Sequence, residues 1–214
     1  METHSDSACR SAQKSNRRTL ILTCCVFLLP VALASILHVT GWYASAGTSN
    51  KGTLISPPIP FEAVLKAGHS SAAFIAENHD KAWWILYIMP QQCDSACRNS
   101  LFQMRQVQAA LGPEKHRVNA LLIATAHLTP EYESLLSTEF PTLPVLQADP
   151  NKLTQTFKTH NRTLSSPDGK LYLVDTMGAI FMHYPTYIDE KKSVLKGRDI
   201  LKDLQRVLKL SKIG

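Results

Sequence analysis

The chain has 214 residues, of which 44% are hydrophobic and 19% charged, and this apolar content excludes an intrinsically disordered chain. Its formal net charge is +6. Residues 1–18 contain four basic and two acidic residues and residues 19–42 contain neither, so a net charge of +4 remains for the rest of the chain. That value is too small to indicate a nucleic-acid partner.

The first predicted element is a membrane anchor over residues 19–42 (TLILTCCVFLLPVALASILHVTGW). This run has no charged residue and is long enough to cross a hydrocarbon core about 30 Å thick. Basic residues precede it, whereas Lys51 is the only charged residue between Tyr43 and Pro60, so the positive-inside rule predicts that residues 1–18 form a cytoplasmic tail. The alternative is a cleaved signal peptide, because Ala44-Ser45-Ala46 fits a cleavage site, but the apolar region of such a peptide usually has about 7–15 residues.

The segment after the anchor, residues 43–60 (YASAGTSNKGTLISPPIP), is rich in Gly, Ser, Thr and Pro and predicts a linker. A single domain then follows over residues 61–214. Its short apolar runs predict strands, and apolar residues at helical spacing predict helices. The predicted strands are 83–89, 117–125, 143–148, 170–175 and 178–184, and the predicted helices are 97–111, 129–140, 151–160 and 198–211.

Strands that alternate with helices predict an α/β layer structure. The last two strands are joined by a short turn at residues 175–178, which predicts an antiparallel hairpin. Trp83 and Trp84 open the first strand of the domain and should pack on its two opposite faces. Five basic residues between Lys191 and Lys202 alternate with acidic ones, and this mixture predicts a solvated helix face.

Cysteine placement follows this layout. Cys9 lies in the predicted tail, and Cys24 and Cys25 lie in the predicted span. Cys93 and Cys97 are the only cysteines of the domain over residues 61–214, which we call the outer domain. An oxidising compartment would leave neither of these two unpaired.

Cys93 and Cys97 stand as C-D-S-A-C between a predicted strand and a predicted helix. Residues four apart on a helix share a face, with Cα atoms about 6 Å apart, and a disulfide closes over about 4.4–6.8 Å. Two thiolates also suit Cu(I). The pair can therefore exchange electrons with other thiols, hold copper, or staple a loop. A purely structural disulfide that closes so small a loop would add little to the stability of the protein.

In the redox interpretation, Cys93 is the predicted attacking thiol, because a helix N-terminus favours a thiolate. Cys97, one turn inside the helix, is the predicted resolving thiol. Asp94 opposes this activation, since a like charge disfavours the thiolate.

The order of elements resembles the thioredoxin-like fold, a central mixed sheet with flanking helices, here preceded by one N-terminal transmembrane helix. Within that fold, the C-x-x-x-C spacing, the anchor and the L-Y-L-V-D-x-x-G segment at 171–178 resemble the Sco (SenC) family of membrane-anchored copper chaperones and thiol oxidoreductases. The resemblance covers about residues 61–210. P-Q-Q-C-D-S-A-C-R and M-R-Q-V-Q-A-A-L-G are similar to segments of the small Sco-like membrane proteins of proteobacterial cytochrome oxidase gene clusters.

This resemblance implies a single-pass protein of the inner (plasma) membrane, with a cytoplasmic N-terminus and a periplasmic C-terminal domain. It also implies that the partners are protein thiols, those of the copper-bearing subunit of cytochrome c oxidase.

The chain departs from the Sco family at one position. Sco proteins take a third copper ligand from a histidine about eight residues before the aspartate of this strand, and counting back from Asp175 reaches Pro167. The family histidine is missing, so no cofactor is expected to be required. Proline at this place is similar to the thioredoxin cis-proline that faces the cysteine pair, which predicts that Pro167 shapes the site and that Ser166-Pro167 is a candidate cis bond.

Copper(I) binding by Cys93 and Cys97 remains an alternative, and His160 and His183 are the nearest substitutes in sequence for the missing ligand. His69, His79, His116 and His127 show no metal-binding spacing and are predicted to be surface residues.

The first functional hypothesis is a membrane-anchored thiol–disulfide oxidoreductase that assists assembly of the copper centre of cytochrome c oxidase, with Cys93 and Cys97 as its catalytic residues. One alternative is a copper(I) metallochaperone that uses the same pair. The other is an assembly adaptor whose disulfide is purely structural.

Overall fold

The computed structural model describes residues 5–40, 49–67, 82–164 and 166–211, with side chains from residue 17 onward. It divides into two compact units, Met1–Ser49 and Asn50–Gly214. The first contains helix α1 (Ser5–Thr40), in which Arg17–Thr40 is long and apolar enough to cross a membrane. The candidate span is thus confirmed as a helix that continues through Pro30. The Ala44-Ser45-Ala46 motif and the side chain of Cys9 lie outside the described residues.

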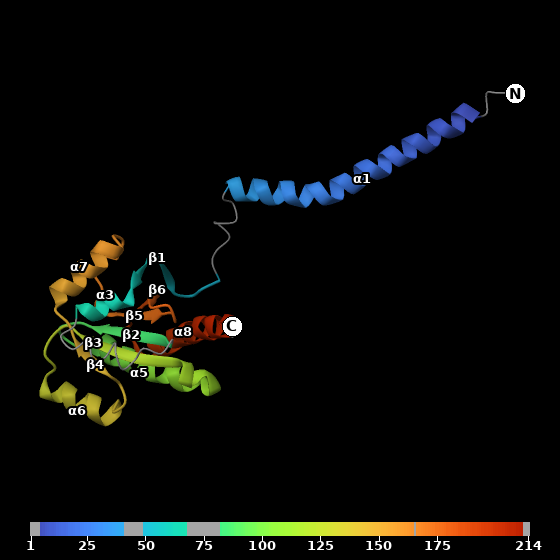
Figure 1. Cartoon of the computed structure of the whole chain (residues 1–214). Helices are drawn as coiled ribbons and strands as arrows, with labels where there is room; N and C mark the ends of the chain where they lie inside the picture. The colour runs from blue at the N-terminus through green and yellow to red at the C-terminus, as the bar shows by residue number, and fades with distance from the viewer. Residues whose placement is uncertain (1–4, 41–48, 68–81, 165, 212–214) are drawn as a thin grey trace. The chain divides into compact units, whose positions relative to one another are not determined.

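The second unit is built on a six-stranded mixed sheet in the order β1-β6-β5-β2-β3-β4 (Figure 1). The strands β2, β3 and β4 are parallel, whereas β5, β6 and β1 continue the sheet through antiparallel pairings. Their bounds are β1 (Thr53–Pro60), β2 (Trp83–Met89), β3 (Val118–Ala124), β4 (Val145–Gln147), β5 (Lys170–Val174) and β6 (Ala179–Pro185). The five predicted strands and the closing hairpin are therefore confirmed.

Helices flank the sheet as the sequence predicts. Their bounds are α3 (Phe61–Lys66), α5 (Ser95–Ala110), the 3₁₀ helix η1 (Gly112–Arg117), α6 (Pro130–Glu139), α7 (Pro150–His160) and α8 (Glu190–Leu210). The last helix begins eight residues before its predicted start. Asp189 caps it, because its carboxylate accepts a hydrogen bond from the backbone N–H of Lys192 at 3.0 Å.

Two apolar layers hold this unit together. Helices α5, α6 and α8 cover one face of the sheet, and α3 and α7 cover the other (Figure 1). Their buried side chains form one layer on each face. Trp83 belongs to the first layer, with its ring edge-on to Phe181 at 6.0 Å, and Trp84 belongs to the second, with its ring 5.9 Å from that of Phe61. The predicted opposite packing of the two tryptophans is confirmed.

Strand β1 corrects the predicted linker. Residues 53–60 pair with β6, and Ile55 and Ile59 are buried in the core. The prolines of this segment are compatible with a strand because β1 lies at the edge of the sheet, where one side of the strand has no partner to which an N–H must donate. The prediction of a linker over residues 43–60 is therefore wrong from Thr53 onward.

A buried carboxylate fixes the start of the domain. Asp203 of α8 has an exposed fraction of only 3%, and its Oδ2 accepts hydrogen bonds from the backbone N–H groups of Lys51 (2.8 Å) and Gly52 (2.9 Å). The hydroxyl of Tyr184 donates to the same oxygen at 2.9 Å. The chain therefore enters the folded domain against α8.

Candidate active site

The cysteine pair follows the carboxyl end of β2, at the sheet edge where open α/β folds place their functional sites. This strand end is held from both sides. The hydroxyl of Thr125, just after β3, donates to the carbonyl of Met89 at 2.9 Å, and the N–H of Gly169, just before β5, donates to the carbonyl of Ile88 at 2.8 Å. The loop that carries Cys93 thus begins from a fixed point.

Cys93 and Cys97 form a disulfide, with Cα atoms 5.1 Å apart. The Cα spacing of about 6 Å that applies to two residues of one helix does not apply here, because α5 begins at Ser95 and Cys93 precedes it. Asp94 is the N-cap, and its carboxylate accepts a hydrogen bond from the backbone N–H of Cys97 at 3.0 Å. This capping role was not among the predictions, although an aspartate directly before an amphipathic run is a typical helix start.

The two sulfur-bearing residues differ in exposure. Cys97 has an exposed fraction of 1% and packs in the layer between the sheet and α5, whereas Cys93 is half-buried at its rim. The predicted order of accessibility is therefore confirmed. A reagent in solution reaches Cys93 first, and Cys97 stays behind it.

Helix α6 contacts the exposed cysteine through a residue that the sequence did not single out. The hydroxyl of Tyr132 donates a hydrogen bond to the backbone carbonyl of Cys93. Cys93 is thus bound covalently to α5 and by a hydrogen bond to α6, which fixes its backbone outside the helix.

A buried phenol lies in the same layer as Cys97. Burial raises the pKa of Tyr87 well above its ordinary value, a hydrogen bond with Ser100 opposes this rise, and the charges of Asp94 and Asp168 add to it. The Tyr87 hydroxyl therefore remains protonated at neutral pH. The hydrogen bond from Gly169 to Ile88 shows that the segment before β5 meets the end of β2.

Pro167 lies in the loop before β5, two residues from Gly169 and hence close to the end of β2. Its ring is buried, and its carbonyl accepts a hydrogen bond from the hydroxyl of Tyr172 at 2.7 Å. In the described part of the chain the cis peptide bond is Ser56–Pro57, so the suggested cis bond at Ser166–Pro167 is absent. The role of Pro167 in shaping the site remains a prediction.

The two histidines proposed as substitute copper ligands have their contacts away from the cysteine pair. The ring of His183 on β6 lies 6.2 Å from that of Tyr172, a residue of the layer under α7, and His160 ends α7 with its Nδ1 2.9 Å from the carbonyl oxygen of Thr156. Cys97 packs on the α5 face. Among the described residues, no three His, Cys, Asp or Glu side chains gather into a metal-binding group. The histidines therefore do not complete a copper site with the cysteines.

The four histidines that were predicted to be surface residues have different outcomes. His116 and His127 are exposed, as predicted, whereas His69 and His79 lie outside the described residues.

A groove of about 300 Å³ runs between α5 and α8. Its lining includes Arg98, the residue after Cys97 in sequence, and the apolar side chains of Phe102 and Val194, with exposed fractions of 42% and 58%. The groove thus combines polar and exposed apolar side chains of α5 and α8.

Comparison with known proteins identifies a family. The model of the family described as "Transmembrane-like, thioredoxin-like, C-terminal domain" matches residues 83–211. A search of curated proteins gave no significant match.

Several solved structures are similar to the chain. A SCO1/SenC family lipoprotein from Bacillus anthracis has 16% identity and a TM-score of 0.42, and the match covers 61% of this chain and 84% of that one. ScoI from Arabidopsis thaliana, with copper bound, has 14% identity and a TM-score of 0.43, over 61% and 88% of the two chains. A thiol:disulfide interchange protein of the thioredoxin family from Chlorobium tepidum has 19% identity and a TM-score of 0.40, over 70% and 99%.

Proposed function

Because the chain belongs to the transmembrane-like, thioredoxin-like C-terminal domain family, we propose that it is a membrane-anchored thiol–disulfide oxidoreductase that acts on protein cysteines. The observation that carries this proposal is the asymmetric pair, a half-buried Cys93 ahead of the helix and a buried Cys97 inside it. This is the arrangement that an attacking and a resolving thiol require.

The exchange proceeds in two steps from the reduced protein. The Cys93 thiolate attacks one sulfur of a partner disulfide and forms a mixed disulfide, and the partner's other sulfur leaves as a thiolate that takes up a proton. The Cys97 thiolate then attacks the Cys93 sulfur, releases the second partner thiol and closes the Cys93–Cys97 disulfide. Two electrons pass from this pair to the partner.

The proposed partner is the copper-bearing subunit of cytochrome c oxidase, whose cysteines must be reduced before they can bind copper. The sequence resemblance to Sco proteins supports this partner, and the groove between α5 and α8, with exposed apolar side chains, supports a polypeptide substrate rather than a small thiol. The positive-inside pattern before the span supports a periplasmic location for the domain.

Trapping the mixed disulfide tests the proposal. In the full chain with Cys9, Cys24 and Cys25 replaced by Ser, Cys97→Ser should form a covalent adduct with the oxidised oxidase subunit, because no resolving thiol remains. The matched Cys93→Ser variant should form none. Equal adducts with both variants, or with neither, would contradict the assigned roles. If Cys97→Ser forms an adduct with oxidised glutathione but not with the subunit, the chain is an oxidoreductase, but the subunit is not its partner.

A copper(I) metallochaperone is the second candidate, because reduced Cys93 and Cys97 would supply two soft ligands. His160 and His183 do not fit as the third ligand, since no three His, Cys, Asp or Glu side chains among the described residues gather into a metal-binding group. Titration of the reduced chain with Cu(I) beside a competing chelator distinguishes the two functions. The oxidoreductase proposal predicts no tight one-to-one complex, whereas a tight complex that is lost in Cys93→Ser would favour the chaperone.

A further inference from the structure

Helix α8 concentrates the positive charge of the outer domain. Residues 190–210 contain seven basic and three acidic residues, a net charge of +4. Residues 43–214 also have a net charge of +4, so the rest of this region is balanced. A single helix therefore accounts for the net charge of everything that follows the membrane span.

Most of these basic residues share one exposed face. They recur at the three- and four-residue spacing of a helix, and all are exposed, as is the leucine among them. We call this set the basic face of α8: Lys191, Leu195, Arg198, Lys202, Arg206 and Lys209.

The acidic residues of α8 do not neutralise this face. Asp203 is buried and accepts the hydrogen bonds that fix the start of the domain, and Asp199 pairs with Lys196 at 3.0 Å. Glu190 lines the groove toward α5 together with Arg198. The three acidic residues of α8 therefore leave an excess of positive charge on this helix.

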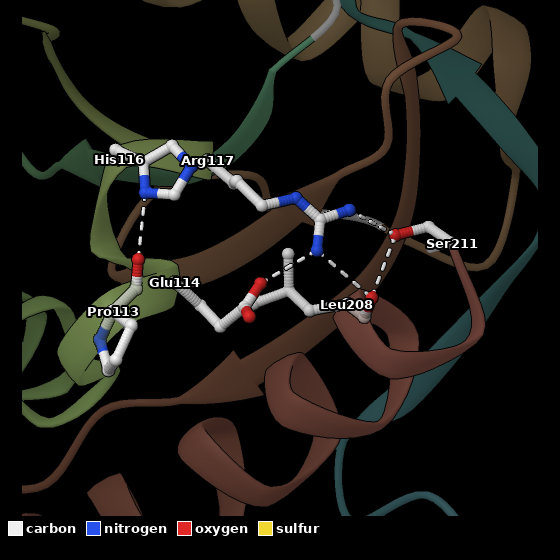
Figure 2. Close-up of polar contacts among 6 residues, drawn as sticks. All are labelled: Pro113, Glu114, His116, Arg117, Leu208 and Ser211. Carbon is white, nitrogen blue, oxygen red and sulfur yellow. Dashed lines mark hydrogen bonds and ion pairs between the residues drawn. The ribbon is translucent and has the colours of Figure 1, made fainter. Parts of the chain in front are cut away.

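This helix is held in place at both ends. At its start, the side-chain amide of Asn99 donates to the carbonyls of Tyr187 (3.0 Å) and Ile188 (2.8 Å). At its end, the Arg117 guanidinium donates to the carbonyl of Leu208 at 3.1 Å and to the hydroxyl of Ser211 at 2.8 Å (Figure 2).

Arg117 is itself positioned by its neighbours in η1. Glu114 Oε2 accepts from its Nη1 at 2.7 Å, and the guanidinium lies at the helix end that favours a cation (Figure 2). The basic face is thus a rigid surface rather than a flexible tail.

The chain reaches the domain at this same helix. The N–H groups of Lys51 and Gly52 donate to Asp203, whereas the candidate span ends at Thr40. Eleven positions separate Thr40 from Lys51 in the sequence. The helix that carries the charge is the one that the chain contacts where it enters the folded domain.

We propose that the basic face of α8 binds the anionic headgroups of the bilayer that the anchor crosses. Lysine and arginine side chains form charge-assisted contacts with lipid phosphates, and a cluster of them on an amphipathic helix is typical of anionic-lipid binding. Leu195, with an exposed fraction of 59%, lies among them and inserts at the interface, as apolar residues of membrane-surface helices do. This inference concerns a surface apart from the disulfide and does not depend on its chemistry.

A depth measurement on the full chain tests this proposal. Leu195→Cys, in a background with Cys9, Cys24 and Cys25 replaced by Ser, carries a nitroxide label, and the chain is placed in nanodiscs of phosphatidylcholine alone or with phosphatidylglycerol. The proposal predicts that collisions with a water-soluble nickel complex fall severalfold only in the anionic discs. About 0.5 M salt should abolish this protection, because it screens the charges.

Two sets of variants control the measurement. A label at Gln155→Cys, exposed on α7 at the other face of the sheet, should show no difference between the lipids. Lys191→Gln and Lys202→Gln should each lower the affinity of this face for the anionic lipid about fivefold, and the protection of the label should fall accordingly. One basic residue at a membrane surface contributes roughly that factor in affinity. Equal accessibility of the Leu195→Cys label in both lipids would overturn the proposal. Protection by polyglutamate but not by anionic lipid would overturn it in favour of an acidic protein partner.

Discussion

The carboxylate of Asp94 accepts a hydrogen bond from the backbone N–H of Cys97 at 3.0 Å, so the helix cap lies in sequence between the two cysteines and fixes the buried one. Asp94 therefore acts on the site in two opposed ways. Its hydrogen bond stabilises the start of α5, and its negative charge, next to Cys93, disfavours a thiolate there.

Substitution of Asp94 separates these two effects. Asp94→Asn keeps a capping side chain but removes the charge, so the reduced chain should be alkylated faster at Cys93 at neutral pH with little change in stability. Asp94→Ala removes both, and its free energy of unfolding should fall by about 1 kcal/mol. Alkylation rates and denaturant unfolding of the full chain in detergent measure the two quantities. Slower alkylation of Asp94→Asn would show that the charge does not oppose the thiolate.

Tyr132 provides a test of the contact between α6 and the site. Tyr132→Phe removes the hydrogen bond to the Cys93 carbonyl and retains the ring, so the free energy of unfolding of the oxidised chain should decrease by about 1 kcal/mol. Thermal unfolding compares this variant with Tyr187→Phe, which lies at the start of α8 and whose hydroxyl makes no contact with Cys93. An unchanged stability would mean that α6 does not hold the exposed cysteine.

The sequence predicted the elements whose pattern is set by burial. Residues 83–89 form a continuous apolar run because β2 lies in the middle of the sheet with a helical layer on each face, and every residue of the strand is buried. The disulfide could also be predicted from local sequence. Cys93 and Cys97 are only four residues apart, so their Cα atoms stay within disulfide distance when the chain turns into the helix.

The missed features depend on long-range partners. Residues 53–60 contain three prolines and lack a strict alternation, and they form a strand only because β6 offers an edge. The first two turns of α8 carry mostly charged residues, so the apolar period becomes visible only near Ile200. The contact between Tyr132 and Cys93 joins residues 39 apart, which no local pattern indicates.

Gly52 tests the docking of the segment before β1. A Cβ atom at this position would lie 2.6 Å from Met182 Sδ and from ring atoms of Tyr184, inside the core. Gly52→Ala should therefore lower the free energy of unfolding by about 1–3 kcal/mol, as overpacking does. Lys51→Ala, at the exposed neighbouring residue, retains the backbone N–H and should be neutral. Equal stability of both variants, measured by denaturant unfolding, would contradict the edge pairing of this segment.

His183 should make stability depend on pH. Burial lowers its pKa from the ordinary value, and the charge of Lys170 adds to this effect. As the pH falls through about 6.5, the unfolded chain takes up a proton that the folded chain does not, so stability decreases from pH 7 to pH 5.

Removal of the imidazole tests this linkage. His183→Gln should lose less stability than the parent chain between pH 7 and pH 5, measured by denaturant unfolding at both values. His127→Gln, at an exposed position, should retain the parent's pH dependence. Identical pH profiles for the His183 variant and the parent would rule out the proposed linkage.

The reduction potential of the Cys93–Cys97 disulfide, measured on the full chain equilibrated with defined thiol–disulfide buffers, tests the oxidoreductase account most directly. The account predicts a potential above about −300 mV, in the range of disulfides that exchange with protein thiols. A potential below about −300 mV would contradict it, because a disulfide so resistant to reduction serves as a structural staple.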